Sequence, residues 1–445
     1  MTRTDVTVLG AGLAGSEAAW QLARRGWRVA LWEMRPAVMT PAHRTGRFAE
    51  LVCSNSLKSE APASAPYLLK EELRHLGSLL LRVADGCRVP AGQALAVDRQ
   101  RFAESVEAAV RSEAGIAVVS AEARTLPAAR PVIVATGPLT SPALAEALRG
   151  LAGAEHLFFY DAISPIVAGA SVDRAVAFAA SRYGKGGDDY LNCPLNRKEY
   201  QAFIEALRAA DTYPRHDFEA DAYFEGCLPI EEIVRRGDDT LRFGPMKPVG
   251  LVDPRTGTVP YAALQLRRED VLGDAFNLVG FQTRLRQGEQ QRVFRLIPGL
   301  ARAEFIRFGQ IHRNTYLNAP AVLNPEQEFR DHPGVFAAGQ LCGLEGYIEA
   351  VATGLMAGLQ ADRRLRGLPP VRFPRDTALG SLQHALGAAD PRGYQPLNIT
   401  FALLPPPPPE LERRLHGKAA RHAWRVRESL QALRDFAARD GVRPA

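Results

Sequence analysis

The segment Asp5-Val-Thr-Val-Leu-Gly-Ala-Gly-Leu-Ala-Gly15 carries the spacing G-x-G-x-x-G directly after a short apolar run. A helix is expected over residues 16–25 and a second strand over residues 29–32, followed by Glu33. In this setting the first glycine permits a tight turn, the second lets the backbone approach a pyrophosphate, and the third lets helix and strand pack closely.

The free N–H groups at the start of such a helix favour phosphate, and the Glu33 carboxylate can accept a hydrogen bond from a ribose hydroxyl. The context therefore predicts a dinucleotide site, with an ordinary strand-to-helix turn as the alternative. The residues expected to form it are Gly10, Ala11, Gly12, Leu13, Ala14, Gly15 and Glu33.

Two later segments extend the same fold. Residues 131–137 predict a strand ending in Ala-Thr-Gly, an ending that recurs in two-dinucleotide-fold flavoproteins, and residues 334–340 predict a strand that returns to the first sheet. Glycines then precede a helix, whose positive end favours the anion of a reduced flavin. A plain glycine-rich loop is the alternative. The cofactor residues expected here are Thr136, Gly137, Gly339, Gln340, Gly343 and Gly346.

Composition excludes several classes of protein. The chain has 445 residues with 46% hydrophobic and 23% charged residues, as in soluble globular proteins, and no apolar run long enough for a transmembrane helix. The first strand begins within a few residues of the start, which leaves no room for a signal peptide and favours the cytoplasm. Five cysteines without a C-x-x-C pair predict neither a disulfide framework nor a metal site. The net charge of +6 permits a polyanionic partner without requiring one.

The fold class expected is α/β: a Rossmann-like FAD-binding domain with an inserted α+β domain. The first domain is expected to be discontinuous, over residues 1–150 and 320–445, and the insertion to cover residues 151–319. Single helices are predicted over residues 67–81, 100–111 and 197–209, and strands over residues 156–160 and 276–281. The prolines at 405–409 indicate a stiff connector to a basic helical tail.

Two of the cysteines stand in unusual surroundings. Cys53 is followed by Ser-Asn-Ser, which could orient a substrate or cap a helix, and Cys227 follows a small glycine and precedes two acids. On the residues alone, a cysteine in such surroundings is more often a buried core residue than a nucleophile. Cys87, Cys193 and Cys342 are expected to be filler.

Taken together, these segments closely resemble the folate- and flavin-dependent tRNA uracil-5 methyltransferases, which are relatives of the larger wobble-uridine modification flavoproteins. Gln93 and Ala319 depart from the usual family pattern, and neither is a proposed chemical group. The matching segments are residues 10–15, 33–36, 41–43, 48–56, 88–92, 135–141, 159–161, 190–194, 243–251, 279–283, 297–299, 312–318 and 343–347.

The resemblance implies a cytosolic enzyme that forms 5-methyluridine at position 54, in the T loop of tRNA. It implies FAD as cofactor, 5,10-methylenetetrahydrofolate as one-carbon donor and NAD(P)H as reductant, with tRNA (its T arm) and folate as partners and no membrane. A thiolate that adds to C6 of uracil would make C5 nucleophilic. The positions that match the family's reactive cysteines are Cys227, expected to be the nucleophile, and Cys53, expected to assist proton transfer or to hold Cys227 between turnovers. The division of labour between them stays open.

Three other functions remain possible on the sequence. The chain could be a wobble-uridine-modifying flavoprotein, although those proteins are longer. It could be an NAD(P)H-dependent flavin oxidoreductase, for which Cys227 would be dispensable. It could also be a non-catalytic flavoprotein that binds tRNA as a folding helper. The oligomeric state is not predicted.

Overall fold

A five-stranded parallel sheet carries the N-terminal glycine motif. In the computed structural model, the described residues are 4–152, 156–184, 187–213, 228–270, 272–392, 394, 396–412, 414–442 and 444, with the backbone alone described for 156–163, 311–315 and 412. The strand order is β16-β7-β1-β2-β6, and every pair in it is parallel. The strands are β1 (Val6–Leu9), β2 (Val29–Glu33), β6 (Ile116–Ser120), β7 (Val132–Val134) and β16 (Val335–Ala337).

The late strand β16 pairs with β7, so the chain returns to its first sheet after a long excursion, as the sequence predicted. Four of these five strands are short apolar runs that are almost wholly buried, as expected for parallel strands covered on both faces. The predicted α/β class with a Rossmann-like parallel sheet is thereby confirmed.

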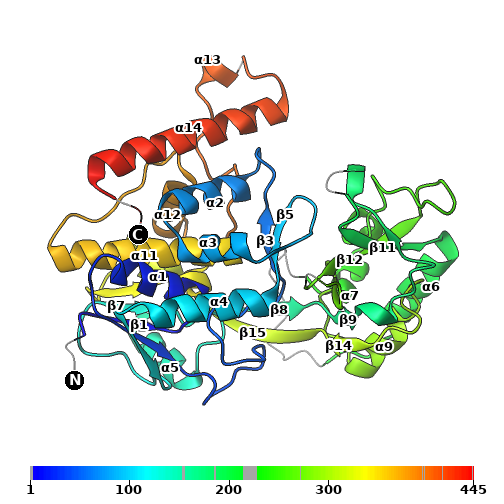
Figure 1. Ribbon diagram of the computed structural model, residues 1–445, viewed down its shortest axis with the longest axis horizontal. Coiled ribbons are helices and arrows are strands. Elements are labelled where there is room, and N and C mark those ends of the chain that lie inside the picture. The colour runs from blue at the N-terminus through cyan, green and yellow to red at the C-terminus, as the bar shows by residue number, and fades with distance from the viewer. Residues whose placement is uncertain are drawn as a thin grey trace.

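Helices α1 (Leu13–Ala23) and α11 (Tyr347–Arg366) pack against each other beside this sheet (Figure 1). Their contact is close because α11 carries Gly354, where a Cβ atom would lie 2.2 Å from the carbonyl oxygen of Ala14. A glycine is needed at this point, since a larger residue would separate the two helices. The packing joins the glycine motif near the start of the chain to the second glycine-rich segment near residue 340.

One helix prediction was wrong. Residues 67–81 do not form a single helix but belong to α2 (Ala65–His75) and α3 (Leu79–Gly86). Gly77, with φ +75°, breaks the run, and the Ser78 side chain then caps α3 by accepting from the N–H of Leu81. The apolar periodicity continues through the break and therefore concealed it. The predictions for α4 (Arg99–Ser112) and α6 (Arg197–Arg208) agree with the structure within two residues.

A second, antiparallel sheet with its own hydrophobic core lies apart from the first (Figure 1). Its order is β10-β11-β12-β13-β9-β14, and the two-stranded pair β8 (His156–Ile163) and β15 (Gln310–Leu317) leads to it from the first sheet. The six strands are β9 (Ile166–Ala168), β10 (Phe178–Ala179), β11 (Tyr190–Leu195), β12 (Ala262–Arg268), β13 (Ala275–Leu278) and β14 (Phe305–Arg307). A small third sheet contains β3 (Ser56–Ser59), β4 (Arg88–Val89) and β5 (Ala94–Val97).

The C-terminal helix α14 (Gly417–Asp440) lies over α2 and buries Val426, Leu433 and Phe436 against the first core (Figure 1). None of the helices in the described part of the chain is both long enough and apolar enough to span a membrane. The remaining helices are α5 (Pro142–Ala152), α7 (Ile230–Arg235), α8 (Thr240–Phe243), α9 (Gln287–Phe294), α10 (Ala319–Val322), α12 (Ala378–Ala388) and α13 (Pro409–Glu412).

Candidate functional site

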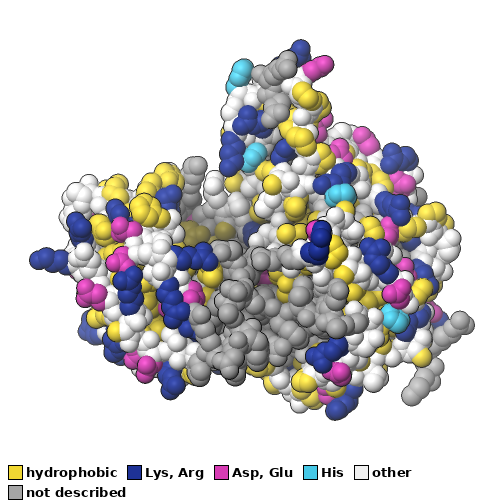
Figure 2. Space-filling view, turned by 180° about the vertical axis from the view of Figure 1, so that it is seen from behind, with side chains coloured by type: hydrophobic (Ala, Val, Ile, Leu, Met, Phe, Trp, Pro, Cys, Tyr) yellow, Lys and Arg dark blue, Asp and Glu magenta, His cyan; other side chains and the backbone are white. Residues whose placement is uncertain are grey.

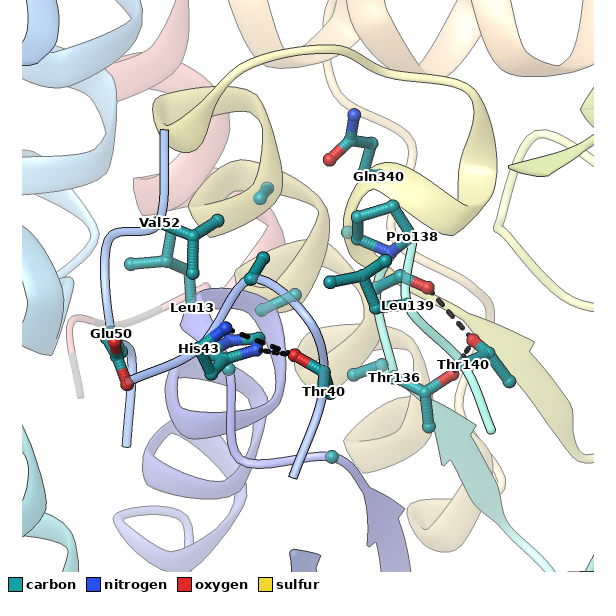
Figure 3. Close-up of a pocket in the computed structure, with 18 of the residues that line it drawn as sticks. Leu13, Thr40, His43, Glu50, Val52, Thr136, Pro138, Leu139, Thr140 and Gln340 are labelled. Carbon is teal, nitrogen blue, oxygen red and sulfur yellow. Dashed lines mark hydrogen bonds between the residues drawn. The ribbon is translucent and has the colours of Figure 1, made fainter. Parts of the chain in front are cut away.

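A cavity opens at the carboxyl ends of β1, β2 and β7, which is where open α/β sheets bind their ligands (Figure 3). Figure 3 shows His43, Glu50 and Leu13 on one side of the cavity, and Pro138 and Leu139 on the other. Of the residues predicted from the sequence, the cavity is lined by Gly10, Gly12, Leu13, Ala14, Glu33, Cys53, Thr136, Gly137, Gly339, Gln340 and Gly346.

The three motif glycines have three different surroundings. Gly10 has φ +95°, and a Cβ there would lie 2.7 Å from the carbonyl oxygen of Ala135. A Cβ on Gly15 would lie 1.8 Å from the carbonyl oxygen of Gly10, so this glycine permits the helix to pack on the turn. A Cβ on Gly12 would meet no atom within 4 Å, and Gly12 lines the cavity. The space in front of Gly12 is therefore open to a ligand.

Two helix N-termini border this cavity. Helix α1 follows Gly12 and helix α11 follows Gly346, and neither N-cap has a side chain that could satisfy the first N–H groups. Unsatisfied N–H groups and the positive helix end favour an anion. A pyrophosphate at α1 and an electron-rich ring at α11 match this arrangement, so the residues present fit an FAD molecule.

Glu33 is held more tightly than the sequence indicated. Its carboxylate accepts from the backbone N–H of Ala11 (2.9 Å) and from the guanidinium of Arg35 (2.9 and 3.0 Å). Burial raises the pKa of Glu33, but the hydrogen bonds and charge of Arg35 outweigh it and leave the pKa below the ordinary value. Glu33 is therefore ionised at neutral pH, and it fixes the glycine turn through Ala11.

Neutral groups also form part of the cavity wall. His43 lies within hydrogen-bonding distance of the Thr40 hydroxyl (2.5 Å), and burial together with the charge of Arg35 lowers its pKa to about 4. On the opposite wall, the Thr136 and Thr140 hydroxyls are 2.6 Å apart (Figure 3). At neutral pH the wall beside Arg35 thus presents an uncharged imidazole.

Cys53 is half-buried on the cavity wall. The hydroxyl of Tyr347, in the first turn of α11, accepts from the backbone N–H groups of Cys53 (2.8 Å) and Ser54 (3.1 Å). Burial, followed by the negative charge of Cys53, raises the pKa of Tyr347, so the phenol stays protonated. This pair of bonds joins the cysteine segment to the start of α11.

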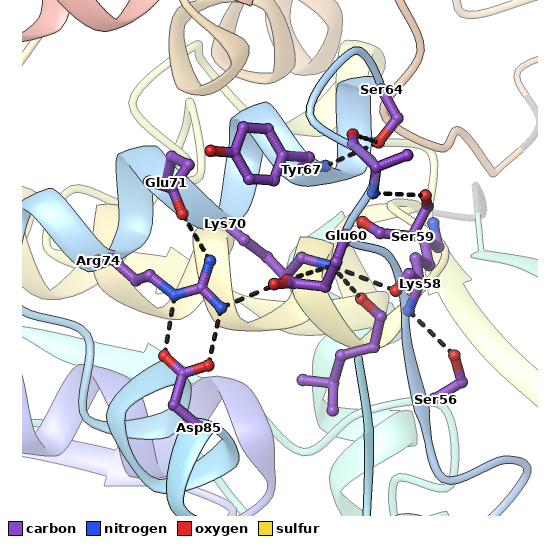
Figure 4. Close-up of polar contacts among 12 residues, drawn as sticks. Ser56, Lys58, Ser59, Glu60, Ser64, Tyr67, Lys70, Glu71, Arg74 and Asp85 are labelled. Carbon is purple, nitrogen blue, oxygen red and sulfur yellow. Dashed lines mark hydrogen bonds and ion pairs between the residues drawn. The ribbon is translucent and has the colours of Figure 1, made fainter. Parts of the chain in front are cut away.

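Lys58 also faces the cavity, although the sequence did not single it out. It has φ +64°, an uncommon conformation for a residue with a side chain, and its Nζ donates to Glu349 and to Asn398 (2.8 Å). The backbone around it is held from the other side by Lys70, whose buried Nζ donates to the carbonyl oxygens of residues 57, 58 and 59 (Figure 4). Burial lowers the pKa of Lys70 to about 8, while its ion pair with Glu60 opposes the change.

Not every predicted residue reaches the cavity. Ala11 is buried behind it, Gly15 packs on Gly10, and Gly343 packs on Tyr394, where a Cβ would lie 2.6 Å from the ring. Cys227 lies outside the described residues. Cys87, Cys193 and Cys342 are buried, as expected of filler.

The sequence model of the family "Glucose inhibited division protein A" matches residues 5–369. A methylenetetrahydrofolate–tRNA-(uracil-5-)-methyltransferase TrmFO from Desulforudis audaxviator is 56% identical over 427 residues, which are 96% of this chain and 97% of that protein. The protein of the same name from Symbiobacterium thermophilum is 58% identical over 410 residues, or 91% and 92% of the two chains. The chain belongs to the Glucose inhibited division protein A family and, within it, to the methylenetetrahydrofolate–tRNA-(uracil-5-)-methyltransferases.

Among solved structures, Aquifex aeolicus GidA superposes with a TM-score of 0.68 at 16% identity, over 97% of this chain and 73% of that one. At this identity the likeness shows a shared fold. The family membership rests on the sequence matches, and the cavity described above lies within the matched region.

Proposed function

We propose that this chain is a folate- and FAD-dependent tRNA (uracil-5-)-methyltransferase that acts on uridine 54 in the T loop. The observation that carries the proposal is a cavity with two uncapped helix N-termini and Cys53 on its wall, in a chain that shares more than half of its residues with proteins of that name. Bound FAD would relay the one-carbon unit from 5,10-methylenetetrahydrofolate, with NAD(P)H as the reductant.

The residues that would hold the cofactor divide by position. Gly12 and the first N–H groups of α1 would hold the pyrophosphate, and Gly346 with the first turn of α11 would face the flavin ring. Thr136, Gly137, Gly339 and Gln340 complete the wall. Glu33 keeps the glycine turn in place and is available to a ribose hydroxyl.

The substrate would be activated by a cysteine. Addition of a thiolate to C6 of uracil moves an electron pair to C5, which then attacks the one-carbon unit. Loss of the C5 proton expels the nitrogen that carried the one-carbon unit and leaves an exocyclic methylene on the base. A hydride then adds to this methylene, and the thiolate leaves as the C5–C6 double bond forms again. We assign the nucleophile to Cys227 and the assisting role to Cys53, as the family resemblance implies.

A tRNA substrate requires basic surface. Lys and Arg side chains lie on both lobes of the face drawn in Figure 2 rather than in one patch. Helix α14 packs on the fold through one face and exposes basic side chains on the other, among them Arg427 and Arg434. We propose that these side chains contact phosphates of the T arm.

We also propose that the enzyme works in the cytoplasm and has two domains. One domain consists of residues 1–150 together with residues 320–445, and the other consists of residues 151–319.

The test is a methylation assay. Purified protein is incubated with unmodified tRNA, 5,10-methylenetetrahydrofolate and NAD(P)H, and the nucleosides are analysed by mass spectrometry. The proposal predicts 5-methyluridine in wild-type tRNA and none in a tRNA whose uridine 54 is replaced by cytidine. Modification at the wobble position, or NAD(P)H oxidation without any modified base, would favour one of the alternative functions.

A further inference from the structure

The segment that carries Cys53 is held by arginines from elements far away in the sequence. Arg99, the first residue of α4, donates to the carbonyl oxygens of Leu51 (2.7 Å) and Cys53 (3.4 Å). Arg307, at the end of β14, donates to the carbonyl oxygen of Val52 (2.6 Å). Three consecutive carbonyl groups are thus bound by two guanidinium groups.

A third arginine holds the other side of the cysteine. Arg267, on β12, donates from Nη2 to the Ser54 hydroxyl (2.7 Å) and from Nε to the Asn55 side chain (2.9 Å). The Asn55 amide in turn donates to the carbonyl oxygens of Val97 (3.1 Å) and Arg268 (2.9 Å). Arg267 and Arg307 both come from the second sheet, so that sheet contacts each flank of Cys53.

The charges of this cluster are unbalanced. Arg99 forms an ion pair with Glu269, but no carboxylate of the described residues is within ion-pairing distance of Arg267 or Arg307. Both of these arginines are 8% exposed, and buried charges in proteins are normally paired. Their guanidinium groups donate to neutral oxygens, so among the described residues the carboxylate of Glu269 offsets only one of the three positive charges of this cluster.

The guanidinium groups also interact electrostatically with the cysteine. Burial, and after it the charges of Arg99 and Arg44, lowers the pKa of Arg307 to about 10, and burial lowers the pKa of Arg267 against the opposing charge of Glu269. A negative charge at Cys53 opposes the shift in both groups as a smaller cause. Negative charge at Cys53 has the same effect on Arg99. All three guanidinium groups are therefore close enough to the cysteine to interact with a thiolate there.

We propose that Arg267 and Arg307 are positioning residues for Cys53, because they fix the segment of residues 51–55 and stabilise a thiolate on that cysteine. The reactivity of Cys53 then depends on the contact between the second sheet and residues 51–55. The inference rests on the proposed role of Cys53 in the reaction. It assigns to β12 and β14 a part in making the cysteine reactive that no motif around Cys53 indicates.

The test measures how fast iodoacetamide alkylates Cys53 as a function of pH, in the full-length FAD-loaded protein. Mass spectrometry of the peptide that contains Cys53 separates it from Cys227. In the wild type the midpoint of the profile is expected below that of an ordinary thiol, about pH 8.5. A wild-type midpoint at or above that value overturns the proposal without any variant.

Variants then separate charge from packing. Arg307→Met and Arg267→Met are expected to lower the alkylation rate at pH 7 about tenfold, because each removes one nearby positive charge. Arg307→Lys should stay close to wild type. The matched control is Arg302→Met, which removes an exposed arginine near β14 and should change nothing. Flavin content and thermal unfolding confirm that each variant is folded.

Two results would contradict the assignment. The first is an unchanged profile in both methionine variants. The second is an equal loss in Arg307→Lys and Arg307→Met, which would show that only the packing of the segment matters. Alkylation needs neither tRNA nor folate, so a Cys53→Ala protein with normal methylation would refute the role of Cys53 and leave this measurement valid.

Discussion

Replacing Gly12 by valine tests whether the cavity holds a pyrophosphate. Gly12 has φ −72° and ψ −165°, an extended conformation that any residue adopts, and its Cβ would meet no protein atom within 4 Å. In the protein without cofactor, the valine side chain is therefore expected to extend into the open cavity. Valine is less favourable than glycine at an N-cap, which lowers the free energy of unfolding, but it also reduces the entropy of the unfolded chain, which raises it. Because the two effects oppose each other, the free energy of unfolding should change by less than about 1 kcal/mol.

The effect on flavin binding should be much larger. The valine side chain would occupy the space in front of the first turn of α1 and separate the phosphate from its N–H groups. A hydrogen bond to a charged group contributes about 1.5–3 kcal/mol, so losing two of them removes about 3–6 kcal/mol. That corresponds to a dissociation constant about 100-fold to 10,000-fold higher.

The assay has two readouts: flavin absorbance per mole of purified protein, followed by FAD titration, and thermal unfolding of the FAD-free protein. Gly15→Ala is the matched comparison, because its Cβ would lie 1.8 Å from the carbonyl oxygen of Gly10 and must destabilise the fold itself. Gly12→Val with a full complement of flavin would refute the placement of the pyrophosphate. FAD-free Gly12→Val protein as unstable as Gly15→Ala would show that Gly12 is a packing residue.

Three further predictions concern the cysteines, the pH dependence and the RNA. Cys227→Ala should abolish methylation and Cys53→Ala should severely reduce it, both with normal flavin content; near-normal turnover of Cys227→Ala would move the nucleophile to another residue. Folding lowers the pKa of His43 to about 4, so between pH 6.5 and pH 4 the imidazole binds a proton in the unfolded chain but not in the folded one. The free energy of unfolding should therefore fall as the pH drops from 6.5 toward 4. Denaturant titrations of His43→Asn should show a flatter dependence over that range, and an unchanged slope would remove His43 as the cause. Exchanging exposed Arg427 and Arg434 for glutamine should weaken tRNA binding and reduce the slope of log affinity against log salt by about 0.7 for each lost phosphate contact, whereas an unchanged slope would exclude this face of α14.

Local patterns were sufficient to predict four of the five strands of the first sheet and most of the cavity-lining residues around them, but the edge strand β6 was not predicted. The glycine spacing at 10–15 fixes a strand, a turn and a helix within one short segment. Gly10 and Gly15 have the close contacts that the spacing implied, and the space in front of Gly12 is open. The strand β16 was predictable because an apolar run ending before glycines has few other places in an α/β fold. These features are encoded by residues close together in the sequence.

The surroundings of Cys53 could not be predicted in the same way. Arg267 and Arg307 lie more than 200 residues from the cysteine, on strands that were not predicted from the sequence. Lys58 was missed because its uncommon backbone conformation follows from buried Lys70, which lies on another element. In both cases the signal is a buried charge that finds its partners only in the folded chain.

The source of the methyl carbon tests the central claim most directly. Tritium- or carbon-13-labelled 5,10-methylenetetrahydrofolate is incubated with the FAD-loaded protein, NAD(P)H and unmodified tRNA, and a parallel reaction contains methyl-labelled S-adenosylmethionine with unlabelled folate. Mass spectrometry of the T-loop fragment should find the folate label in 5-methyluridine at position 54 and no label from S-adenosylmethionine. Label from S-adenosylmethionine in that nucleoside, or no label from the folate, would contradict the account.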